Sequence, residues 1–364
     1  MGTNENNFST IADKIIREII CECYEDGQES QKILNYLNRE NIMPQEIYDW
    51  LLNQHDSKYI NLLGSFYRLG IGTNKNKKKA FEAFQRAANL GSNSAKSALG
   101  VCYQLGFGTN KDYNKAIELF KKLADEEYSE GINSLGVCYL NGTGTSIDKK
   151  KAFELFQKAS NLGNYGSKCW LGLCYQFGYG VKRDHNKAFE LCKESAEGEC
   201  PDGIKRLGRC YLNGIGTSID NKKAFDLFQR AANLGNYESK YLLGLCYQYG
   251  HGVEMDHNKA FEFYKESAEG EWSDGIDHLG SCYLIGIGTS IDKKKAFDLF
   301  QRAANLGNSE AQYNLACMYE IGDGVMKDTK QASYWYNKSA EQGNEYARNK
   351  LESLYLNSTR CSQS

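Results

Sequence analysis

The sequence lacks the features of several large classes of protein. Its 364 residues carry 44 Lys and Arg against 46 Asp and Glu, so no basic excess is available to hold a phosphate backbone, and nucleic acid is not an expected partner. No apolar run approaches the roughly 18 residues that span a bilayer, and the polar residues 1–10 lack the basic and apolar regions of a signal peptide. We therefore expect a protein of the cytoplasm or the nucleus with no membrane partner.

Motifs for catalysis and cofactor binding are also missing. The sequence contains no His-Glu-x-x-His, no nucleophile elbow and no paired Cys-x-x-Cys. Gly-x-Gly-Thr strings recur, but they follow predicted helices and no Gly-Lys-Ser/Thr sequence completes a phosphate loop. His185 and His257 lie two repeating units apart, on the order of 20 Å in a helical array, so they cannot share a metal ion. The sequence predicts no enzyme, no cofactor and no metal site.

What the sequence does contain is a unit of 36 residues that recurs eight times without an insertion. Each copy carries Leu-Gly-x-x-Tyr-x-x-Gly-x-Gly, and its first glycine is Gly64, Gly100, Gly136, Gly172, Gly208, Gly244 or Gly280, with Ala316 in the eighth copy. A fixed period of about 20 to 50 residues predicts a solenoid, because each unit buries its apolar face only by stacking on its neighbours. The array covers residues 59–346, in units 59–94, 95–130, 131–166, 167–202, 203–238, 239–274, 275–310 and 311–346.

Each unit is predicted to be a helical hairpin. In the third unit, Leu135 and Tyr139 share one face of a first helix, which Gly142 ends. Asp148 is then placed to accept hydrogen bonds from the free amides of a second helix, whose apolar stripe includes Phe156. Seven units have aspartate at this capping place, and the first has Asn76: Asp112, Asp148, Asp184, Asp220, Asp256, Asp292 and Asp328. The predicted fold is all-α.

Six of the thirteen cysteines fill one position of the repeat: Cys102, Cys138, Cys174, Cys210, Cys246 and Cys282. Equivalent positions of stacked helices lie near 10 Å apart, whereas a disulfide needs α-carbons within about 7 Å. These cysteines therefore cannot pair along the column. We interpret them as small apolar residues of helix interiors, which fits a reducing compartment.

Lysines gather at the start of the second helices, as at 149–151 and 293–295, where the helix dipole disfavours positive charge. One interpretation is a solvated face, with the stem of the lysine before Ala152 packed on the next hairpin. The other is a basic contact site for an acidic partner.

The motif Leu-Gly-x-x-Tyr-x-x-Gly-x-Gly, followed by Asp, Lys-Ala-Phe and Ala-Ala-x-x-Gly, resembles the SEL-one-like repeat, a relative of the tetratricopeptide repeats. The departures are small: the aromatic pair of the family's second helix is complete only at Trp335 and Tyr336, and Ala316 replaces a glycine. The resemblance implies stacked hairpins in a right-handed superhelix. It also implies an adaptor that assembles complexes and has no active site.

The two ends of the array show helical patterns of their own. Residues 8–25, 29–39 and 44–54 predict three short helices in the segment 1–58, which either cap the first hairpin or dock a partner. Residues 38–52 are similar to the segment between kinase domains and these repeats in some fungal proteins, although no His-Arg-Asp or Asp-Phe-Gly element occurs here. In the segment 347–364, residues 347–355 predict a capping helix, and we expect the tail after Asn357 to be disordered.

The tetratricopeptide relatives line a concave groove with first-helix positions three before, one after, four after and five after the marker glycine. The position four after alternates between Gln and Leu, which follows a longer period of 72 residues also seen in the strings G-T-S-I-D and E-S-A-E-G-E. The candidate partner-binding residues are Gln104, Leu140, Gln176, Phe177, Lys205, Leu212, Tyr241, Gln248, Tyr249, Asp277, Leu284 and Tyr313. The alternative is that these residues only pack the inner helices.

The leading functional hypothesis is a non-enzymatic scaffold that binds a peptide or protein in this concave groove. The alternative is a regulatory module that docks through its N-terminal helices to a separate signalling enzyme, such as a kinase.

Overall fold

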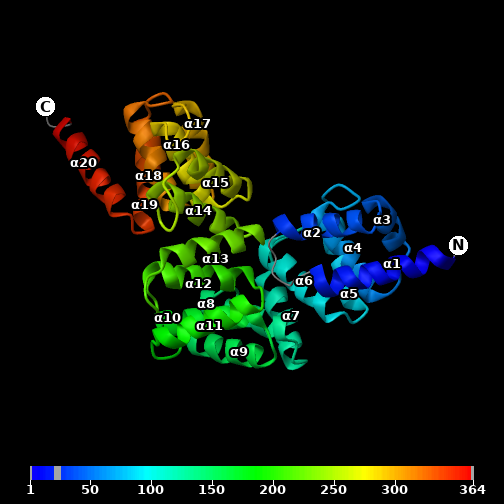
Figure 1. The fold of residues 1–364 in the computed structure, drawn as a ribbon. Helices are drawn as coiled ribbons and strands as arrows, with labels where there is room; N and C mark the ends of the chain where they lie inside the picture. The colour runs from blue at the N-terminus through cyan, green and yellow to red at the C-terminus, as the bar shows by residue number, and fades with distance from the viewer. Residues whose placement is uncertain (1, 20–25, 362–364) are drawn as a thin grey trace. The chain divides into compact units, whose positions relative to one another are not determined.

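The computed structural model describes residues 2–19 and 26–361, and regular structure in these residues is helical throughout (Figure 1). The all-α prediction is therefore confirmed. The chain divides into two compact units, Met1–Ile219 and Asp220–Ser364. Residues 20–25 of the predicted first helix, and the last three residues of the tail, lie outside the described residues.

The first compact unit begins with α1 (Gly2–Lys14), a short π-helix (Ile15–Ile19), α2 (Asp26–Arg39) and α3 (Pro44–Leu52). Four helical hairpins and one further helix follow: α4 (Ser57–Leu69) with α5 (Lys77–Asn89), α6 (Asn93–Leu105) with α7 (Tyr113–Asp125), α8 (Ser129–Asn141) with α9 (Lys149–Asn161), α10 (Tyr165–Phe177) with α11 (His185–Glu197), and α12 (Pro201–Asn213).

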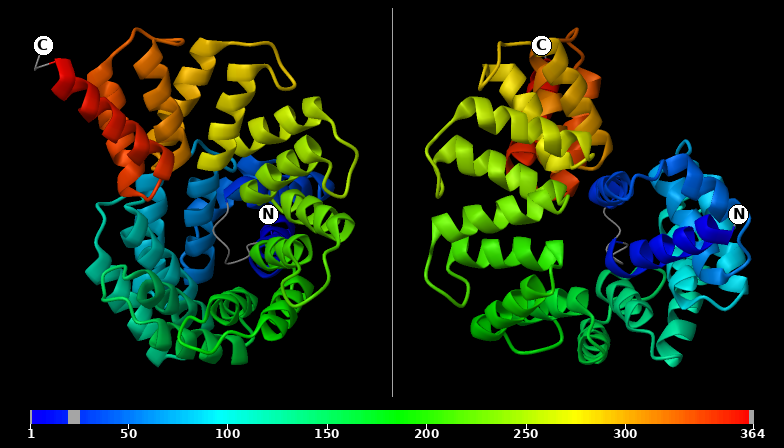
Figure 2. Two further views of the ribbon diagram at one scale, coloured as in Figure 1. Left: turned by 90° about the vertical axis from the view of Figure 1, so that its left-hand side faces the viewer. Right: turned by 45° about the vertical axis from the view of Figure 1, so that its right-hand side comes forward.

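The second compact unit begins with one helix and continues with three hairpins and a final helix: α13 (Asn221–Asn233), α14 (Tyr237–Tyr249) with α15 (His257–Glu269), α16 (Ser273–Ile285) with α17 (Lys293–Asn305), α18 (Ser309–Ile321) with α19 (Thr329–Glu341), and α20 (Glu345–Cys361). In each repeat the first helix is called helix A and the second helix B. The three hairpins of this unit stand side by side in both views of Figure 2.

The hairpins are closed by caps and by close packing at the marker glycine. The carboxylate of Asp148 accepts a hydrogen bond of 2.9 Å from the backbone N–H of Lys151, and the other six aspartates cap their B helices in the same way. Gly142 ends helix A with φ of 71°, a left-handed conformation that glycine adopts without strain. A Cβ at Gly136 would lie 2.6 Å from the Phe156 ring, so only glycine lets the two helices approach so closely.

The tyrosine of the motif joins one hairpin to the next. The ring of Tyr175 makes an edge contact with Phe153 of the preceding helix B, with centroids 5.6 Å apart. The lysine before Ala152, which we expected on the next hairpin, instead places its Nζ 4.3 Å over Tyr139 of its own hairpin. This lysine is the third residue of helix B, and that position faces helix A of the same hairpin. The first lysine of α9, Lys149, is the one that reaches the next hairpin.

The N-terminal helices pack on the first hairpin. Ile15, Ile33 and Ile47 are fully buried in one hydrophobic core with Leu63 and Phe66 of α4. This core removes from water the apolar side of α4 that has no preceding repeat to cover it.

The last helix, α20, is longer than expected. It runs past Asn357 to Cys361, where the sequence analysis predicted a disordered tail from residue 358 onward. No glycine or proline occurs between residues 345 and 361 to end the helix.

Candidate functional site

Several A helices pack on the A helix of the next repeat within the same compact unit. Helix α6 packs against α8 and α10 against α12 in the first unit, and α14 packs against α16 in the second. A ligand that runs along these helices therefore meets the same helix positions once per repeat.

The twelve candidate groove residues differ in exposure. Phe177 and Tyr249 are exposed. Four others of the second unit and three of the first are half-buried: Tyr241, Gln248, Leu284 and Tyr313, and Gln104, Gln176 and Leu212. Leu140, Lys205 and Asp277 are buried, so these three side chains present little surface.

The buried three are held by neighbours that the repeat pattern does not reveal. Leu140 belongs to the hydrophobic core around α8 and α9. The Lys205 ammonium lies 2.6 Å from the Asp202 carboxylate one helical turn away. Asp277 accepts a hydrogen bond of 3.0 Å from Asn314 of the next helix A. The position three before the glycine thus faces the adjacent hairpin more than an open groove.

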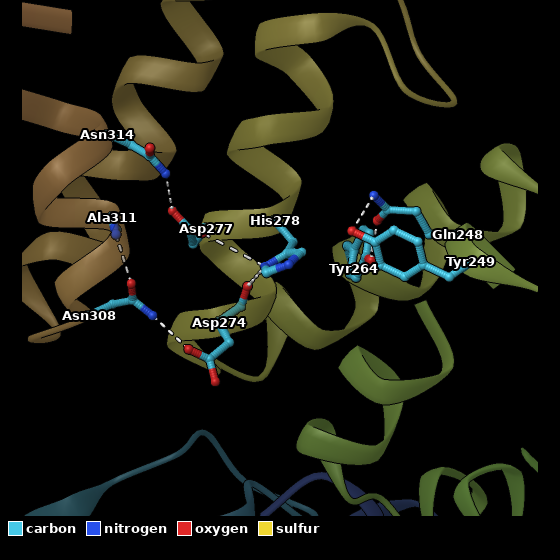
Figure 3. Close-up of polar contacts among 9 residues, drawn as sticks. All are labelled: Gln248, Tyr249, Tyr264, Asp274, Asp277, His278, Asn308, Ala311 and Asn314. Atoms are coloured by element: carbon cyan, nitrogen blue, oxygen red, sulfur yellow. Dashed lines mark hydrogen bonds and ion pairs between the residues drawn. The ribbon is translucent and has the colours of Figure 1, made fainter. Parts of the chain in front are cut away.

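The glutamines four residues after the marker glycine fall into two kinds. In the second unit, the Tyr264 hydroxyl donates to Gln248 Oε1 at 2.5 Å, and Gln248 Nε2 donates to the Tyr249 hydroxyl at 3.2 Å (Figure 3). In the first unit, the helix B residues equivalent to Tyr264 are Phe120 and Cys192, which offer no hydroxyl. Gln104 and Gln176 accordingly form no side-chain hydrogen bond within the described part of the chain.

Asp277 is the centre of a polar cluster in the second unit (Figure 3). Its Oδ2 lies 3.7 Å from Nδ1 of His278, which in turn lies 3.0 Å from the carbonyl oxygen of Asp274. Burial and, to a smaller extent, the nearby carboxylates of Glu310 and Asp274 raise the pKa of Asp277 to about 7, although the hydrogen bond from Asn314 lowers it. Burial also lowers the pKa of His278.

The sequence analysis did not identify His278 or Asn314. The signal for them is weak. Both stand two residues before the marker position, where four units have an apolar residue but the third and fifth have Ser134 and Arg206. The cluster carries a carboxyl group that ionises near neutral pH.

The sequence analysis named the position five after the glycine only at Phe177 and Tyr249. The same position is also exposed at Leu105, Ile285 and Ile321. The sequence does not show this apolar pattern clearly, because the third and fifth units have Asn141 and Asn213 at the same position.

No described helix is long and apolar enough to cross a membrane. Among residues 2–19 and 26–361, no group of three or more His, Cys, Asp or Glu side chains is arranged to hold a metal ion.

Comparison with protein families finds the Sel1 repeat eight times in succession. The matches cover residues 57–92, 94–128, 129–164, 167–199, 201–236, 238–271, 274–308 and 309–344. The helix bounds agree with this phase, since α4 begins at Ser57.

Solved structures with similar chains include two bacterial proteins. A protective antigen of uropathogenic Escherichia coli, described as having an SLR fold, is 30% identical, with 86% of this chain and 67% of that chain covered and a TM-score of 0.48. A Sel1 repeat protein from Oxalobacter formigenes is 25% identical, with 88% and 93% covered and a TM-score of 0.54.

A monomeric mutant of IFIT1, solved with Gppp-AAAA, is 14% identical, with 98% and 87% covered and a TM-score of 0.54, a likeness of fold alone. A search of curated proteins finds no match.

Proposed function

Since this chain belongs to the Sel1 repeat family, whose helical hairpins stack into a solenoid, we propose that it is a non-enzymatic scaffold that binds a peptide or protein segment along its A helices. Repeats of this family suggest protein–protein interaction. We further propose that the partner binds on the A helices of the first compact unit, around Gln104, Gln176 and Phe177.

The two unpaired glutamines carry this proposal. Gln104 and Gln176 are half-buried and have no hydrogen-bond partner among the described residues, so each amide keeps a donor and an acceptor for a ligand. An extended backbone offers the complementary groups, and its affinity would come from apolar contact with Phe177 and Leu212. The equivalent Gln248 is less suited to this role because its amide is already bonded to Tyr264 and Tyr249.

The experiment selects ligands with a phage library of random dodecapeptides and measures their affinity by fluorescence polarisation. Replacing Gln104, Gln176 and Phe177 together by Ala is expected to raise the dissociation constant at least 30-fold, because two hydrogen bonds worth about 1 kcal/mol each and an aromatic contact are lost.

A matched control on the B helices of the same unit replaces Gln85, Gln157 and Tyr113 by Ala. These side chains are exposed, so their loss should leave the affinity unchanged. Equal losses in the two triple variants would contradict binding on the A helices.

The docking alternative has one observation in its favour. Helix α2 and the turn that leads to α3 line an open cleft of about 490 Å³, with residues including Leu34, Asn38 and Met43, and Met43 is exposed. Deleting the N-terminal segment would also remove the core around Ile47, so point substitutions are the better test. If Asn38→Lys with Met43→Glu abolishes capture of a partner while the glutamine variant does not, the N-terminal helices are the docking site.

We assign the chain to a reducing compartment, as proposed from its cysteine column. The six cysteines of that column are buried in helix A, where a small apolar side chain is what the packing requires. The nucleus and the cytoplasm fit equally well.

A further inference from the structure

We propose that two copies of this chain associate through an apolar edge of the second compact unit, formed by Met255, Ile285, Ile291, Ile321 and Met326. This apolar edge shares no residue with the peptide site proposed above. The proposed occupant is a second copy of the chain, and the association does not depend on peptide binding.

The edge is highly exposed. The exposed fractions are 56% for Met255, 61% for Ile285, 60% for Ile291, 67% for Ile321 and 88% for Met326. Single exposed apolar residues are ordinary, but contiguous ones mark interaction sites.

The five residues occupy related places in three consecutive repeats. Ile285 and Ile321 are the last residues of α16 and α18. Met255 and Ile291 directly precede the aspartates that cap α15 and α17, and Met326 stands two residues before the cap of α19. All five therefore lie where helix A turns into helix B.

Contacts within and between hairpins place these turns next to one another, beginning with Gly288, where a Cβ would meet the carbonyl oxygen of His257 at the start of α15. Within a hairpin, a Cβ at Gly286 would lie 3.1 Å from Ile291, which places Ile291 over the end of α16 beside Ile285. Between hairpins, Lys293 at the start of α17 pairs with Asp323 of the next turn at 2.7 Å. A Cβ at Gly324 of that turn would lie 2.5 Å from the Lys293 carbonyl oxygen, so successive turns pack directly on one another.

The size of the edge suits a protein partner. At these exposed fractions the five residues expose on the order of 500–600 Å² of largely apolar surface. That equals the largest patches found on typical monomers. With the polar rim included, it approaches the roughly 800 Å² that each partner contributes to a standard interface.

The spacing and the charge of the edge favour an identical copy. Its apolar residues recur once per repeat, and a second copy related by a two-fold axis presents the same spacing, so that every repeat finds a counterpart. Three lysines of the rim are paired within the chain, Lys259 with Asp256, Lys295 with Asp292, and Lys293 with Asp323. These pairs reduce the charge repulsion between two copies and the attraction of a strongly charged partner.

The first compact unit provides the control. Ile147 and Ile219 stand at the same turn position as Ile291 and are equally exposed. In their own hairpins helix A ends at Asn141 and Asn213, so neither isoleucine has the apolar neighbour that Ile285 provides for Ile291. Lysine at these two positions should not affect association.

The experiment measures the molar mass of the full chain by light scattering and by sedimentation between 1 and 100 µM. We expect about twice the chain mass of 41.1 kDa for the wild type. Ile285→Lys with Ile321→Lys should raise the dissociation constant at least 100-fold, whereas Ile147→Lys with Ile219→Lys should leave it unchanged. Circular dichroism establishes that all variants keep their helix content.

Three outcomes would overturn the proposal: a wild type that stays monomeric at 100 µM, a dimer that survives in the edge variant, or equal dissociation in the two variants. Association through apolar contact should also persist in 1 M NaCl, and dissociation by salt would assign it to charge pairs elsewhere. Peptide affinity is measured on the same variants, so a failure of the dimer leaves the proposed peptide site separately testable.

Discussion

Replacing the buried carboxyl of Asp277 by an amide should stabilise the second compact unit at alkaline pH. Burial raises the pKa of Asp277 from 3.8 to about 7, and each pKa unit corresponds to about 1.4 kcal/mol. The carboxylate at pH 8 therefore costs up to about 4 kcal/mol relative to its neutral form. An amide at this position keeps the acceptor for Asn314 but adds a donor near His278, which can cost about 1–3 kcal/mol. The expected net gain for Asp277→Asn is about 1–3 kcal/mol at pH 8.

The sign of the pH dependence follows from the same shift. A carboxyl whose pKa is raised on folding binds more protons in the folded state between pH 4 and 7, so its contribution to stability is complete below pH 4 and is lost as the pH rises to 7. Glu310 and Asp274 face Asp277 and strengthen this trend, and Asn314 weakens it. Asp277→Asn should therefore gain stability over the wild type at pH 8 and little or none at pH 4.

The assay combines thermal unfolding at pH 5.5 and pH 8 with hydrogen exchange of α16 and α18. Asp298→Asn is the matched control, because Asp298 is exposed on α17 and forms no ion pair among the described residues. A stability change in Asp277→Asn that is the same at pH 8 as at pH 5.5 would refute the reasoning. A carboxyl titration of Asp277 by carbon NMR centred below pH 5 would refute it as well.

The remaining predictions concern packing and thiol reactivity. Gly198→Leu should lower the free energy of unfolding by about 1–3 kcal/mol, because the new side chain overlaps the Tyr165 ring; Tyr165→Ser in the same chain should restore most of it, and a strictly additive double-mutant cycle would contradict the contact. Gly136→Ala should cost more than Gly172→Ala in urea unfolding, since the added Cβ meets an aromatic ring at 2.6 Å in the first case and a cysteine sulfur at 3.0 Å in the second. Burial raises the pKa of Cys138 to about 11, so iodoacetamide at pH 8 should label it only after unfolding, as read by mass spectrometry.

The repeat predicts the fold because the residues that start, end and pack each helix of a hairpin lie within one unit of the sequence. Asp148 caps helix B, Gly142 ends helix A, and Gly136 admits the Phe156 ring, and all three determinants lie within 21 residues. The division of the chain after Ile219 has no such mark. The string Gly-Thr-Ser-Ile-Asp that contains it occurs also in the third and seventh units, so the local sequence cannot indicate where one compact unit ends.

The candidate groove was harder to predict, because exposure depends on residues in the neighbouring repeat. Lys205 and Asp277 stand at one repeat position, and that position is half-buried at Tyr241 but buried at these two. Asp277 is covered because the next helix A supplies Asn314, a residue 37 places further along the chain. A pattern read within one unit does not contain that information.

The 72-residue period combines two different constraints. In the even units, Tyr165 and Tyr237 begin helix A and face Gly198 and Gly270 at the end of helix B. The serine three residues before each glycine donates a hydrogen bond to the carbonyl oxygen of that tyrosine. In the odd units a small residue at the start of helix A accompanies leucine at the end of helix B, as in Ser129 with Leu162, Pro201 with Leu234, and Ser273 with Leu306.

The first residue of helix A is thus large where the residue after helix B is small, and small where that residue is large, so the volume of the pair is roughly conserved. Internal packing alone accounts for the alternation at these two positions. No such compensation accounts for Gln104, which forms no side-chain hydrogen bond among the described residues, or for Ile285 and Ile291, which are exposed. A residue that alternates without a compensating neighbour is constrained by something outside its own hairpin, so these are the positions at which binding should be sought.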